Sequence, residues 1–172
     1  MDDAPSDGSS ELTPRPPQRE DFVRICRELN RLGARYVVVG GFAVIEAGYP
    51  RTTGDIDLLV DSSLENEAKV IEALMILADG CVRDLEPGDL ERFTVVRVAD
   101  EVLVDLMASA SGINYQEAER YTHFREIDGE RIPFATPELL WRMKRHTHRA
   151  KDQGDLVFLR ALFAAEGRQP PD

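Results

Sequence analysis

The chain has no long apolar run, and it contains little cysteine. No apolar stretch approaches the roughly 20 residues that a membrane-spanning helix needs. The first residues, MDDAPSDGSS, are acidic, whereas a signal peptide begins basic and then becomes apolar. The two cysteines, Cys26 and Cys81, lie in apolar helical surroundings, and we expect them to stay thiols in a reducing compartment. These features predict a cytoplasmic protein with no membrane association.

Positive charge is also scarce. Lys and Arg number 21 against 32 Asp and Glu, which gives a formal net charge of -11. Broad nucleic-acid binding neutralises phosphates with many Lys and Arg side chains, so the composition argues against it. The segment 141–151, WRMKRHTHRAK, is an exception because it gathers five of the 21 basic residues. It is a candidate for a local basic patch.

The length of 172 residues fits one domain. Residues 1–17 are rich in Pro, Ser, Asp and Glu, and residues 168–172 are similarly poor in apolar side chains. Such segments cannot bury enough surface to offset the entropy of ordering, so both are predicted to be disordered tails. Residues 18–167 are predicted to form a single domain.

Hydrophobic periodicity predicts both helices and strands in this domain. Helices are predicted over 19–32, 42–48, 63–80, 137–148 and 152–165. Strands are predicted for YVVV (36–39) and DIDLLV (55–60), and antiparallel hairpins for 92–107 and 124–134. Gly40 and Gly41 are expected to form a tight turn between the first strand and its helix. The predicted fold class is α+β, a mixed β-sheet with helices packed on it.

Two aspartates at alternate positions are the first candidate for chemistry. In a strand, Asp55 and Asp57 project to the same face, while Ile56 and Leu58 point into the core. Like charges this close raise each other's pKa unless a cation neutralises them, and Mg²⁺ prefers such oxygen ligands. Many D-x-D triplets have a simpler explanation, in which one aspartate caps a turn and the other is solvated. The surrounding sequence favours the magnesium site.

A glycine pair and a loop of donors precede the aspartates. Gly40 and Gly41 follow a buried strand and let a backbone approach a phosphate closely. The loop before the next strand holds Arg51, Thr52 and Thr53, which are suitable donors to phosphate oxygens. The glycine pair, the loop of donors and the two aspartates occur together within a short segment, so we expect a phosphate-binding pocket there.

A third acid lies in an otherwise apolar strand. Asp105, in VLVDLM, shares a face with Leu103 and Met107. Burying an unpaired carboxylate costs several kcal/mol, so Asp105 needs a metal, a basic partner or a place at the rim of the sheet. We favour a metal shared with Asp55 and Asp57, and the alternative is a salt bridge to an arginine such as Arg97.

The segment 37–61, VVVGGFAVIEAGYPRTTGDIDLLVD, resembles the signature of the nucleotidyltransferase superfamily with the DNA polymerase β-like fold. It is most similar to the small branch of AbiEii-type toxins and related minimal nucleotidyltransferases. The similarity continues through VDLM, the PELL helix and KDQGDL, which covers nearly everything between the two tails. One departure is Phe42, because many members have a serine at this position and this chain lacks that hydroxyl contact to phosphate.

The resemblance implies transfer of a nucleoside monophosphate from a nucleoside triphosphate with the help of Mg²⁺ or Mn²⁺. Carried over by position, Gly40 and Gly41 would cradle the triphosphate, and Asp55 and Asp57 would hold the metals. Asp105 would complete the metal site and help to activate the acceptor hydroxyl. The protein itself would chiefly position the substrates and neutralise charge.

A basic and acidic pattern near the C-terminus also matches this branch. It consists of Lys144, Lys151, Asp152 and Asp155. The resemblance implies that Lys144 and Lys151 contact the triphosphate or the acceptor, and surface ion pairing is the alternative. We expect Arg51 and Lys144 to be exposed donors at the rim of the pocket.

Three hypotheses follow. The first is a metal-dependent nucleotidyltransferase whose acceptor is an RNA, a protein side chain or a small molecule; whether it is the toxin of a toxin–antitoxin pair, with an antitoxin partner, is left open. The second is a noncatalytic nucleotide-binding or partner-binding module on the same fold. The third is a metal-dependent nuclease, which has no use for the glycine turn.

Overall fold

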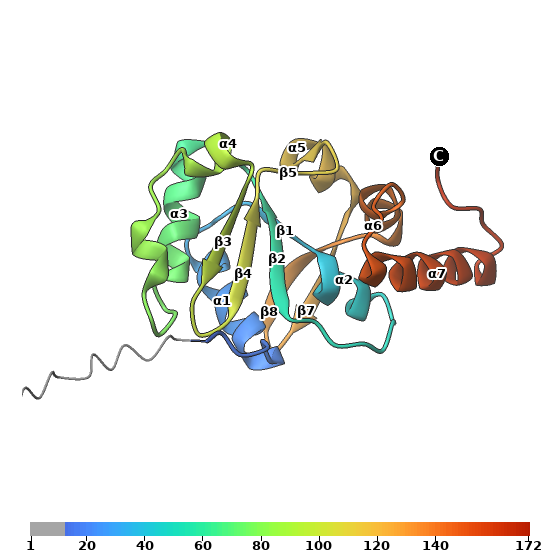
Figure 1. Cartoon of the computed structure of the whole chain (residues 1–172), viewed down its shortest axis with the longest axis horizontal. Coiled ribbons are helices and arrows are strands. Elements are labelled where there is room, and N and C mark those ends of the chain that lie inside the picture. The colour runs from blue at the N-terminus through green and yellow to red at the C-terminus, as the bar shows by residue number, and fades with distance from the viewer. Residues whose placement is uncertain (1–12) are drawn as a thin grey trace, which may run out of the picture.

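The computed structural model describes residues 13–172, and Figure 1 shows the arrangement of its elements. The first half contains α1 (Arg19–Arg31), β1 (Tyr36–Val39), α2 (Gly40–Glu46), β2 (Asp55–Val60), α3 (Leu64–Leu74), η1 (Cys81–Asp84), α4 (Asp89–Phe93), β3 (Val95–Ala99) and β4 (Leu103–Met107). The second half contains β5 (Ser109–Ala110), β6 (Ile113–Asn114), α5 (Tyr115–Ala118), η2 (Glu119–Tyr121), β7 (Thr122–Ile127), β8 (Glu130–Ala135), α6 (Pro137–Lys144) and α7 (Ala150–Ala165).

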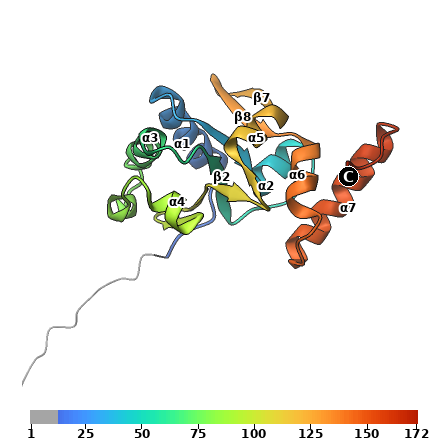
Figure 2. The ribbon, with the colours of Figure 1, turned by 90° about the horizontal axis from the view of Figure 1, so that it is seen from above.

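The larger sheet has six strands in the order β3-β4-β2-β1-β8-β7. The pairs β1–β2, β3–β4 and β7–β8 are antiparallel, and the pairs β2–β4 and β1–β8 are parallel. A sheet that mixes both pairings and carries helices on it is an α+β architecture, as predicted. β5 and β6 form a separate two-stranded sheet. Figure 2 shows α3 and α4 at one end of the molecule and α6 and α7 at the other.

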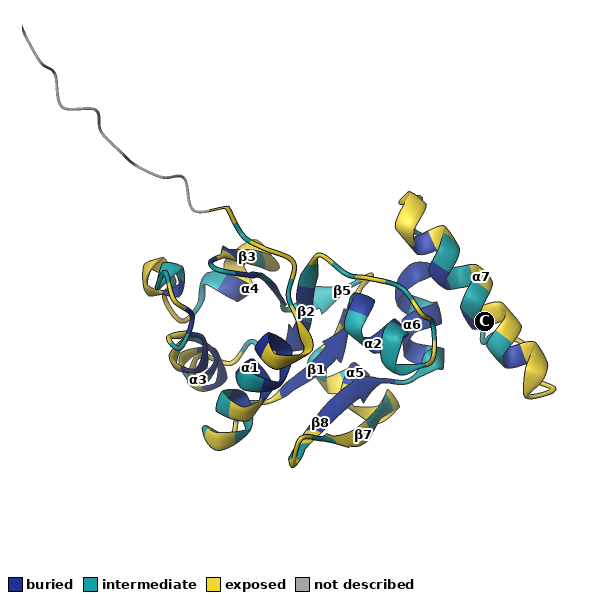
Figure 3. Cartoon of the chain, turned by 90° about the horizontal axis from the view of Figure 1, so that it is seen from below, coloured by how far each residue is buried: buried dark blue, intermediate teal, exposed yellow. Residues whose placement is uncertain are grey.

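One face of the sheet is apolar because alternate residues of each strand point to it. Ile56, Leu58 and Val104 lie on this face and are fully buried. α1 and α3 cover it and pack against each other, and the Phe22 ring of α1 lies 5.9 Å from that of Phe134 in β8. Figure 3 shows the buried residues concentrated along the central strands. The opposite face carries the aspartates and is left partly open to solvent.

Several predicted elements are confirmed with their capping residues. The two predicted strands match β1 and β2, and both predicted hairpins form. Ser63 Oγ accepts a hydrogen bond from the Asn66 N–H at the start of α3, and Thr136 Oγ1 accepts one from the Leu139 N–H at the start of α6. These caps satisfy backbone donors that have no partner within a helix.

Some predicted boundaries are wrong. α2 begins at Gly40 itself, so the glycine pair opens the helix and does not form a separate turn. α3 ends at Leu74, well before Gly80. The backbone N–H groups of Asp79 and Cys81 donate instead to the buried carboxylate of Asp100, at 2.8 and 2.9 Å. These bonds replace those that a longer helix would make.

The end of α6 also differs from the prediction. This helix stops at Lys144, short of the predicted residue 148, and α7 begins at Ala150. Thr147 Oγ1 donates to an Asp152 carboxylate oxygen at 2.8 Å and also lies 3.0 Å from the Lys144 carbonyl oxygen, so the segment between the helices has its own polar contacts. α4, α5 and the small β5–β6 sheet were not predicted, because each has five residues or fewer and shows little periodicity.

Most of the predicted N-terminal tail, residues 1–12, lies outside the described residues. Within residues 13–17, Arg15 donates to both carboxylate oxygens of Asp21 at 2.6 and 2.7 Å. At the other end, the Trp141 Nε1–H donates to the Pro171 carbonyl at 3.1 Å. No helix in residues 13–172 combines the length and the apolar character needed to span a membrane.

Candidate active site

Three aspartates meet on the open face of the sheet. β2 and β4 pair in parallel with Asp57 directly opposite Asp105, and Asp55 lies two residues earlier on β2. One carboxylate oxygen from each residue lies within 4.8 Å of those of the other two. A metal shared by these three residues requires β2 and β4 to be neighbours, and they are. We call Asp55, Asp57 and Asp105 the acid cluster.

Arg97, on the neighbouring strand β3, contacts two members of the acid cluster. It lies directly opposite Asp105, to which its Nε and Nη2 donate at 2.7 and 2.8 Å, and its Nη2 is 3.3 Å from Asp55 Oδ2. The hydrogen bond and charge of Asp105 raise the pKa of Arg97 above its usual value, so this cation is permanent. The sequence leaves two alternatives for Asp105: a place beside Asp55 and Asp57, or a salt bridge to Arg97. In the structure Asp105 has both.

The acid cluster retains excess negative charge despite Arg97. Burial, followed by repulsion from Asp55 and Asp105, raises the pKa of Asp57 to about 7. One guanidinium does not balance three carboxylates, so the cluster is suited to a further cation. Hard divalent ions bind carboxylate oxygens, and this donor set therefore fits Mg²⁺ or Mn²⁺. Among the described residues, the acid cluster is the one group of three or more His, Cys, Asp or Glu side chains close enough to share an ion.

The glycine pair is required by the packing of the site itself. Gly40 has φ +64°, and a Cβ atom there would lie 2.0 Å from Asp57 Oδ2. A Cβ atom on Gly41 would lie 2.3 Å from Thr53 Oγ1. Any side chain at either position would displace a neighbour. The two glycines therefore bring the start of α2 against the acid cluster and the donor loop, and they line the same pocket.

The donor loop 51–54 lies beside the acid cluster. Thr53 Oγ1 donates to the Asp55 carbonyl at 3.1 Å, which ties the loop to β2. Arg51 Nε lies 2.7 Å from Asp155 Oδ1, and its Nη2 donates to Asp155 Oδ2 at 2.9 Å. Thr52 is exposed and lines the pocket. Arg51 is therefore held in place by α7, a contact across 104 positions of sequence.

The Arg51 side chain is only 20% exposed, so the expectation of an exposed donor at the rim is not met there. It is wrong for Lys144, which is buried. Its Nζ lies 2.7 Å from Asp152 Oδ1 and 3.0 Å from Asp155 Oδ2, and both carboxylate side chains are completely buried. Burial opposes the ionisation of Asp152, but hydrogen bonds from Lys144, Thr147 and Arg149 outweigh it and lower its pKa to about 2. An exposed lysine would not have two such partners.

The two buried aspartates and their basic partners form a second group of charges. It contains Arg51, Lys144, Arg149, Asp152 and Asp155, and we call it the paired network. It joins the donor loop, the end of α6 and the start of α7. The predicted role of Lys144 in nucleotide binding stays a prediction, although Lys144 still lines the pocket. The part played by Arg149 was missed, and nothing in the sequence around it distinguishes it from a surface arginine.

Acid cluster and paired network border one pocket of about 570 Å³. Its lining includes Gly40, Gly41, the donor loop and the exposed Lys151. Its volume falls in the range typical of small-molecule sites. An unpredicted part of its wall comes from β5 and the residue that follows it, Ser111. The pocket is therefore acidic at one side and basic at the other.

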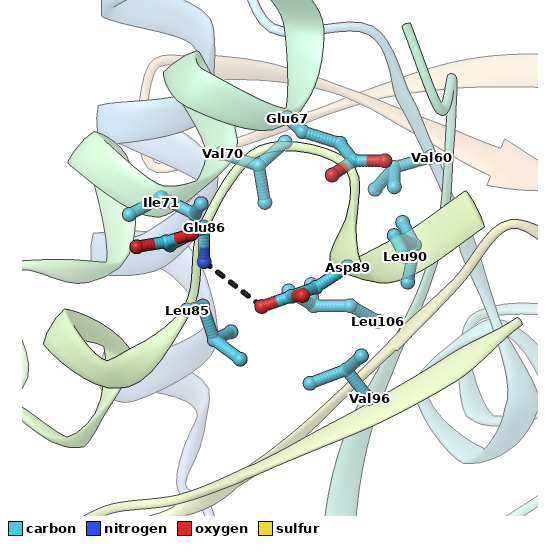
Figure 4. Close-up of a pocket in the computed structure, with 10 residues that line it drawn as sticks. All are labelled: Val60, Glu67, Val70, Ile71, Leu85, Glu86, Asp89, Leu90, Val96 and Leu106. Carbon is cyan, nitrogen blue, oxygen red and sulfur yellow. Dashed lines mark hydrogen bonds between the residues drawn. The ribbon is translucent and has the colours of Figure 1, made fainter. Parts of the chain in front are cut away.

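A smaller apolar pocket lies on the opposite face of the sheet, between α3, α4 and the strands (Figure 4). Val60, Val96 and Leu106 form its floor, and Glu86 and Asp89 lie at its side. Its volume of about 20 Å³ holds roughly one water molecule. It is too small for a nucleotide. The pocket beside the acid cluster is the candidate active site because it combines three clustered carboxylates with basic donors.

Comparison with known proteins supports the fold. No family model and no curated protein sequence matches the chain. The structure is similar to that of the lincosamide antibiotic adenylyltransferase LnuA bound to lincomycin, with a TM-score of 0.54 and 14% identity over 86% of this chain and 99% of that chain. It is also similar to an antigenic nucleotidyltransferase-like protein from Paracoccidioides brasiliensis, with a TM-score of 0.50 and 20% identity over 87% of this chain and 78% of that chain.

Both similarities extend over most of the chain, and at these identities they establish architecture alone. They do not single out the AbiEii-type branch. The mixed sheet, the acid cluster shared by β2 and β4, and these structural relatives lead to the same conclusion: the chain has the fold of the nucleotidyltransferases.

Proposed function

We propose that the protein is a metal-dependent nucleotidyltransferase that moves a nucleoside monophosphate from a nucleoside triphosphate to an acceptor hydroxyl. The observation that carries this proposal is the acid cluster: three carboxylates from two paired strands whose ligand atoms lie within 4.8 Å of one another. A cluster with this much uncompensated charge costs free energy in a protein that has no use for it.

The division of charge within the pocket suggests how the substrate lies. The triphosphate would extend from the acid cluster toward Lys151 and the guanidinium of Arg51, because these donors lie on the basic side. Asp155 fixes the Arg51 side chain at 2.7 and 2.9 Å, so little conformational entropy remains to be lost when a phosphate binds. Gly40 and Gly41 let the backbone lie directly against Asp57 and Thr53, and both glycines line the same pocket.

Asp55, Asp57 and Asp105 would hold the divalent cations. Such ions lower the pKa of the acceptor hydroxyl and neutralise the charge that develops on the departing pyrophosphate. In the reaction, the acceptor hydroxyl would lose its proton to Asp105, its oxygen would bond to the α-phosphorus, and the bond between that phosphorus and the pyrophosphate oxygen would break. The contribution of the chain is to align the two oxygens and to exclude alternative geometries.

The acceptor is the least constrained part of the proposal. LnuA, a structural relative, is an antibiotic adenylyltransferase, and its whole chain is covered by this fold. A small-molecule acceptor therefore needs no additional domain. The resemblance to AbiEii-type toxins suggests instead an RNA or protein acceptor and an antitoxin partner. The toxin role, like the compartment, stays a prediction.

The proposal is tested with each nucleoside triphosphate labelled in turn at the α- or the γ-phosphate. Purified protein is incubated with Mg²⁺ or Mn²⁺ and with RNA, protein or small-molecule acceptors. We expect label to reach one acceptor class from the α-labelled nucleotide only, and Asp57→Asn to abolish the transfer. Transfer from the γ-labelled nucleotide would indicate phosphoryl transfer and would reject the proposal.

The noncatalytic alternative has one observation in its favour, because Arg97 already pairs with Asp105 and Asp55. A binding module would retain this salt bridge when the nucleotide enters. It would bind nucleoside triphosphate without cation and would label no acceptor. Calorimetric titration with and without Mg²⁺ separates the two functions.

A further inference from the structure

Arg97 contacts two carboxylates of the acid cluster, whereas an ordinary surface salt bridge joins one arginine to one carboxylate. Arg97, Asp105 and Asp57 form one row across three adjacent strands, because each lies opposite the next in the register of the sheet. The guanidinium engages both oxygens of Asp105 and also approaches Asp55 at 3.3 Å. It therefore uses oxygens from two of the three carboxylates that would bind a metal.

The rest of the chain offers a matched comparison. Arg35 pairs with Asp61, and the arginine side chains of the two pairs are equally exposed, at 53%. Their aspartates are also similarly buried, at 9% for Asp61 and 13% for Asp105. Arg35 contacts one carboxylate on its own, whereas Arg97 bridges two. A half-exposed arginine paired with a largely buried aspartate therefore need not contact a second carboxylate, as Arg97 does.

A guanidinium in this place opposes metal binding. A divalent cation on the acid cluster would be a few ångströms from Arg97, and both would depend on the same oxygens. Like charges at such a distance repel by about 1 kcal/mol or more even at high dielectric. The negative charge of a nucleoside triphosphate would reverse this effect, because its phosphates attract both cations at once.

Arg97 also has room to move. Its strand β3 is an edge of the sheet, with no strand beyond it among the described residues, and its side chain is half exposed. If it left Asp105, it could pair with a phosphate oxygen with the planar geometry that arginine favours. Such a movement would free both Asp105 oxygens while keeping the guanidinium in the pocket.

We propose that Arg97 is a built-in counter-ion that makes divalent-cation binding depend on the nucleotide. This rests on the proposed function. Arg97 holds Asp55 and Asp105 in position while the pocket is empty and weakens the affinity of the empty pocket for a cation. When the nucleotide binds, its phosphates draw Arg97 away from Asp105, and the cation binds together with the nucleotide. Arg97 is thus a positioning residue that couples two ligands.

The test compares Mn²⁺ binding, measured by electron paramagnetic resonance, in wild type, Arg97→Met and Arg97→Lys. Each protein is titrated without nucleotide and with a set of nonhydrolysable nucleoside triphosphate analogues, one for each base. Without an analogue, we expect Arg97→Met to bind Mn²⁺ about tenfold more tightly than wild type, because a repelling charge is gone. The analogue that binds should reduce this difference to about threefold or less, since its phosphates offset the charge of Arg97.

The controls keep the outcome interpretable. Arg35→Met removes the matched salt bridge away from the pocket and should leave Mn²⁺ affinity at the wild-type value. Arg97→Lys keeps the charge and should stay close to wild type, and it serves alone if Arg97→Met does not fold. A full tenfold gain in Arg97→Lys would overturn the charge argument.

Two further results would be decisive. Equal or weaker Mn²⁺ binding by Arg97→Met without an analogue, or a difference that persists with every analogue, would overturn the role of Arg97 and leave the acid cluster as a metal site. Absence of Mn²⁺ binding to wild type under all of these conditions would instead reject the metal site and the proposed function with it.

Discussion

Two groups of buried charge lie at the same pocket, and they differ in balance. The acid cluster sets three carboxylates against the single guanidinium of Arg97. The paired network sets three basic side chains against two carboxylates, and each carboxylate has at least two partners. Both groups contain largely buried carboxylates. Only in the acid cluster do the carboxylates outnumber their basic partners.

The pKa values of the two groups show the consequence. Burial and carboxylate neighbours raise the pKa of Asp57 to about 7, whereas burial of Asp152 is outweighed by basic partners that lower its pKa to about 2. The same residue type is thus shifted in opposite directions by its neighbours. A buried aspartate indicates a functional site when its charge is unbalanced and a structural one when it is paired.

The largest difference between the two groups should be in activity. Asp57→Asn should reduce nucleotidyl transfer by roughly a thousandfold or more, because the amide keeps the volume but loses the charge that holds the cation. Its thermal melting temperature without metal should equal or exceed that of wild type, since a repelling carboxylate is gone. Transfer assays and melting curves in EDTA check this. A variant that stays active, or that melts far lower, would contradict the assignment.

The paired network should respond in the opposite way, through stability. Lys144→Met should lower the free energy of unfolding by about 3–5 kcal/mol, because it leaves Asp152 and Asp155 buried with fewer partners. Urea denaturation measures the change. Lys69→Met is the control, since Lys69 is partly exposed and its pair with the exposed Glu65 should contribute less than about 1 kcal/mol. A similar small loss in both variants would show that Lys144 is not structural.

These two groups were predicted unequally from the sequence. Alternation in β2 placed Asp55 and Asp57 on one face, and the hairpin pattern placed Asp105 in a strand that pairs with β3. Both signals are local. The burial of Lys144 depends on α7 packing against α6 and on the donor loop, which lies 104 positions from its partner Asp155. Local periodicity carries no information about such a contact.

The same limit explains two other differences. The chain beyond α3 does not continue the predicted helix, and the Asp79 N–H donates instead to Asp100, 21 positions away. From the sequence, a salt bridge to Arg97 and a metal site were alternatives for Asp105. The sequence alone does not show how many carboxylates one guanidinium contacts. Only the register of three strands shows that it contacts two of them.

The pH dependence of stability should sharpen the contrast between the groups. The pKa of Asp57 in the folded state, about 7, lies above its ordinary value of 3.8. The folded state therefore keeps a proton that the unfolded state loses, and metal-free stability should fall as pH rises from about 4 to about 7. Asp152, with a lowered pKa, contributes its full stability throughout this window and loses it only below pH 4.

Urea unfolding of wild type and Asp57→Asn in EDTA across this window isolates the effect of Asp57. The variant should gain stability relative to wild type as pH rises, and the two should converge near pH 4. If the free energies of unfolding of wild type and variant ran parallel over the whole pH range, the pKa of Asp57 would not be raised by its surroundings.

The smallest effect concerns the exposed basic side of the pocket. Lys151→Ala should weaken nucleoside triphosphate binding by about tenfold, because one exposed charge is lost near the phosphates. Its free energy of unfolding should stay within about 0.5 kcal/mol of wild type. Calorimetric titration provides the affinity, and Lys69→Ala is the control because Lys69 is partly exposed and does not line the pocket. Equal affinity in wild type and both variants would show that Lys151 is a solvated surface lysine that does not contact the nucleotide.

The most direct test of the acid cluster is the position of a bound metal. Crystals grown with Mn²⁺ and a nonhydrolysable nucleoside triphosphate analogue would be measured at the manganese absorption edge. We predict an anomalous peak between the carboxylates of Asp55, Asp57 and Asp105, with the triphosphate running from it toward Lys151. Bound analogue with no peak at these three residues would contradict a metal-dependent transferase and would favour the noncatalytic module.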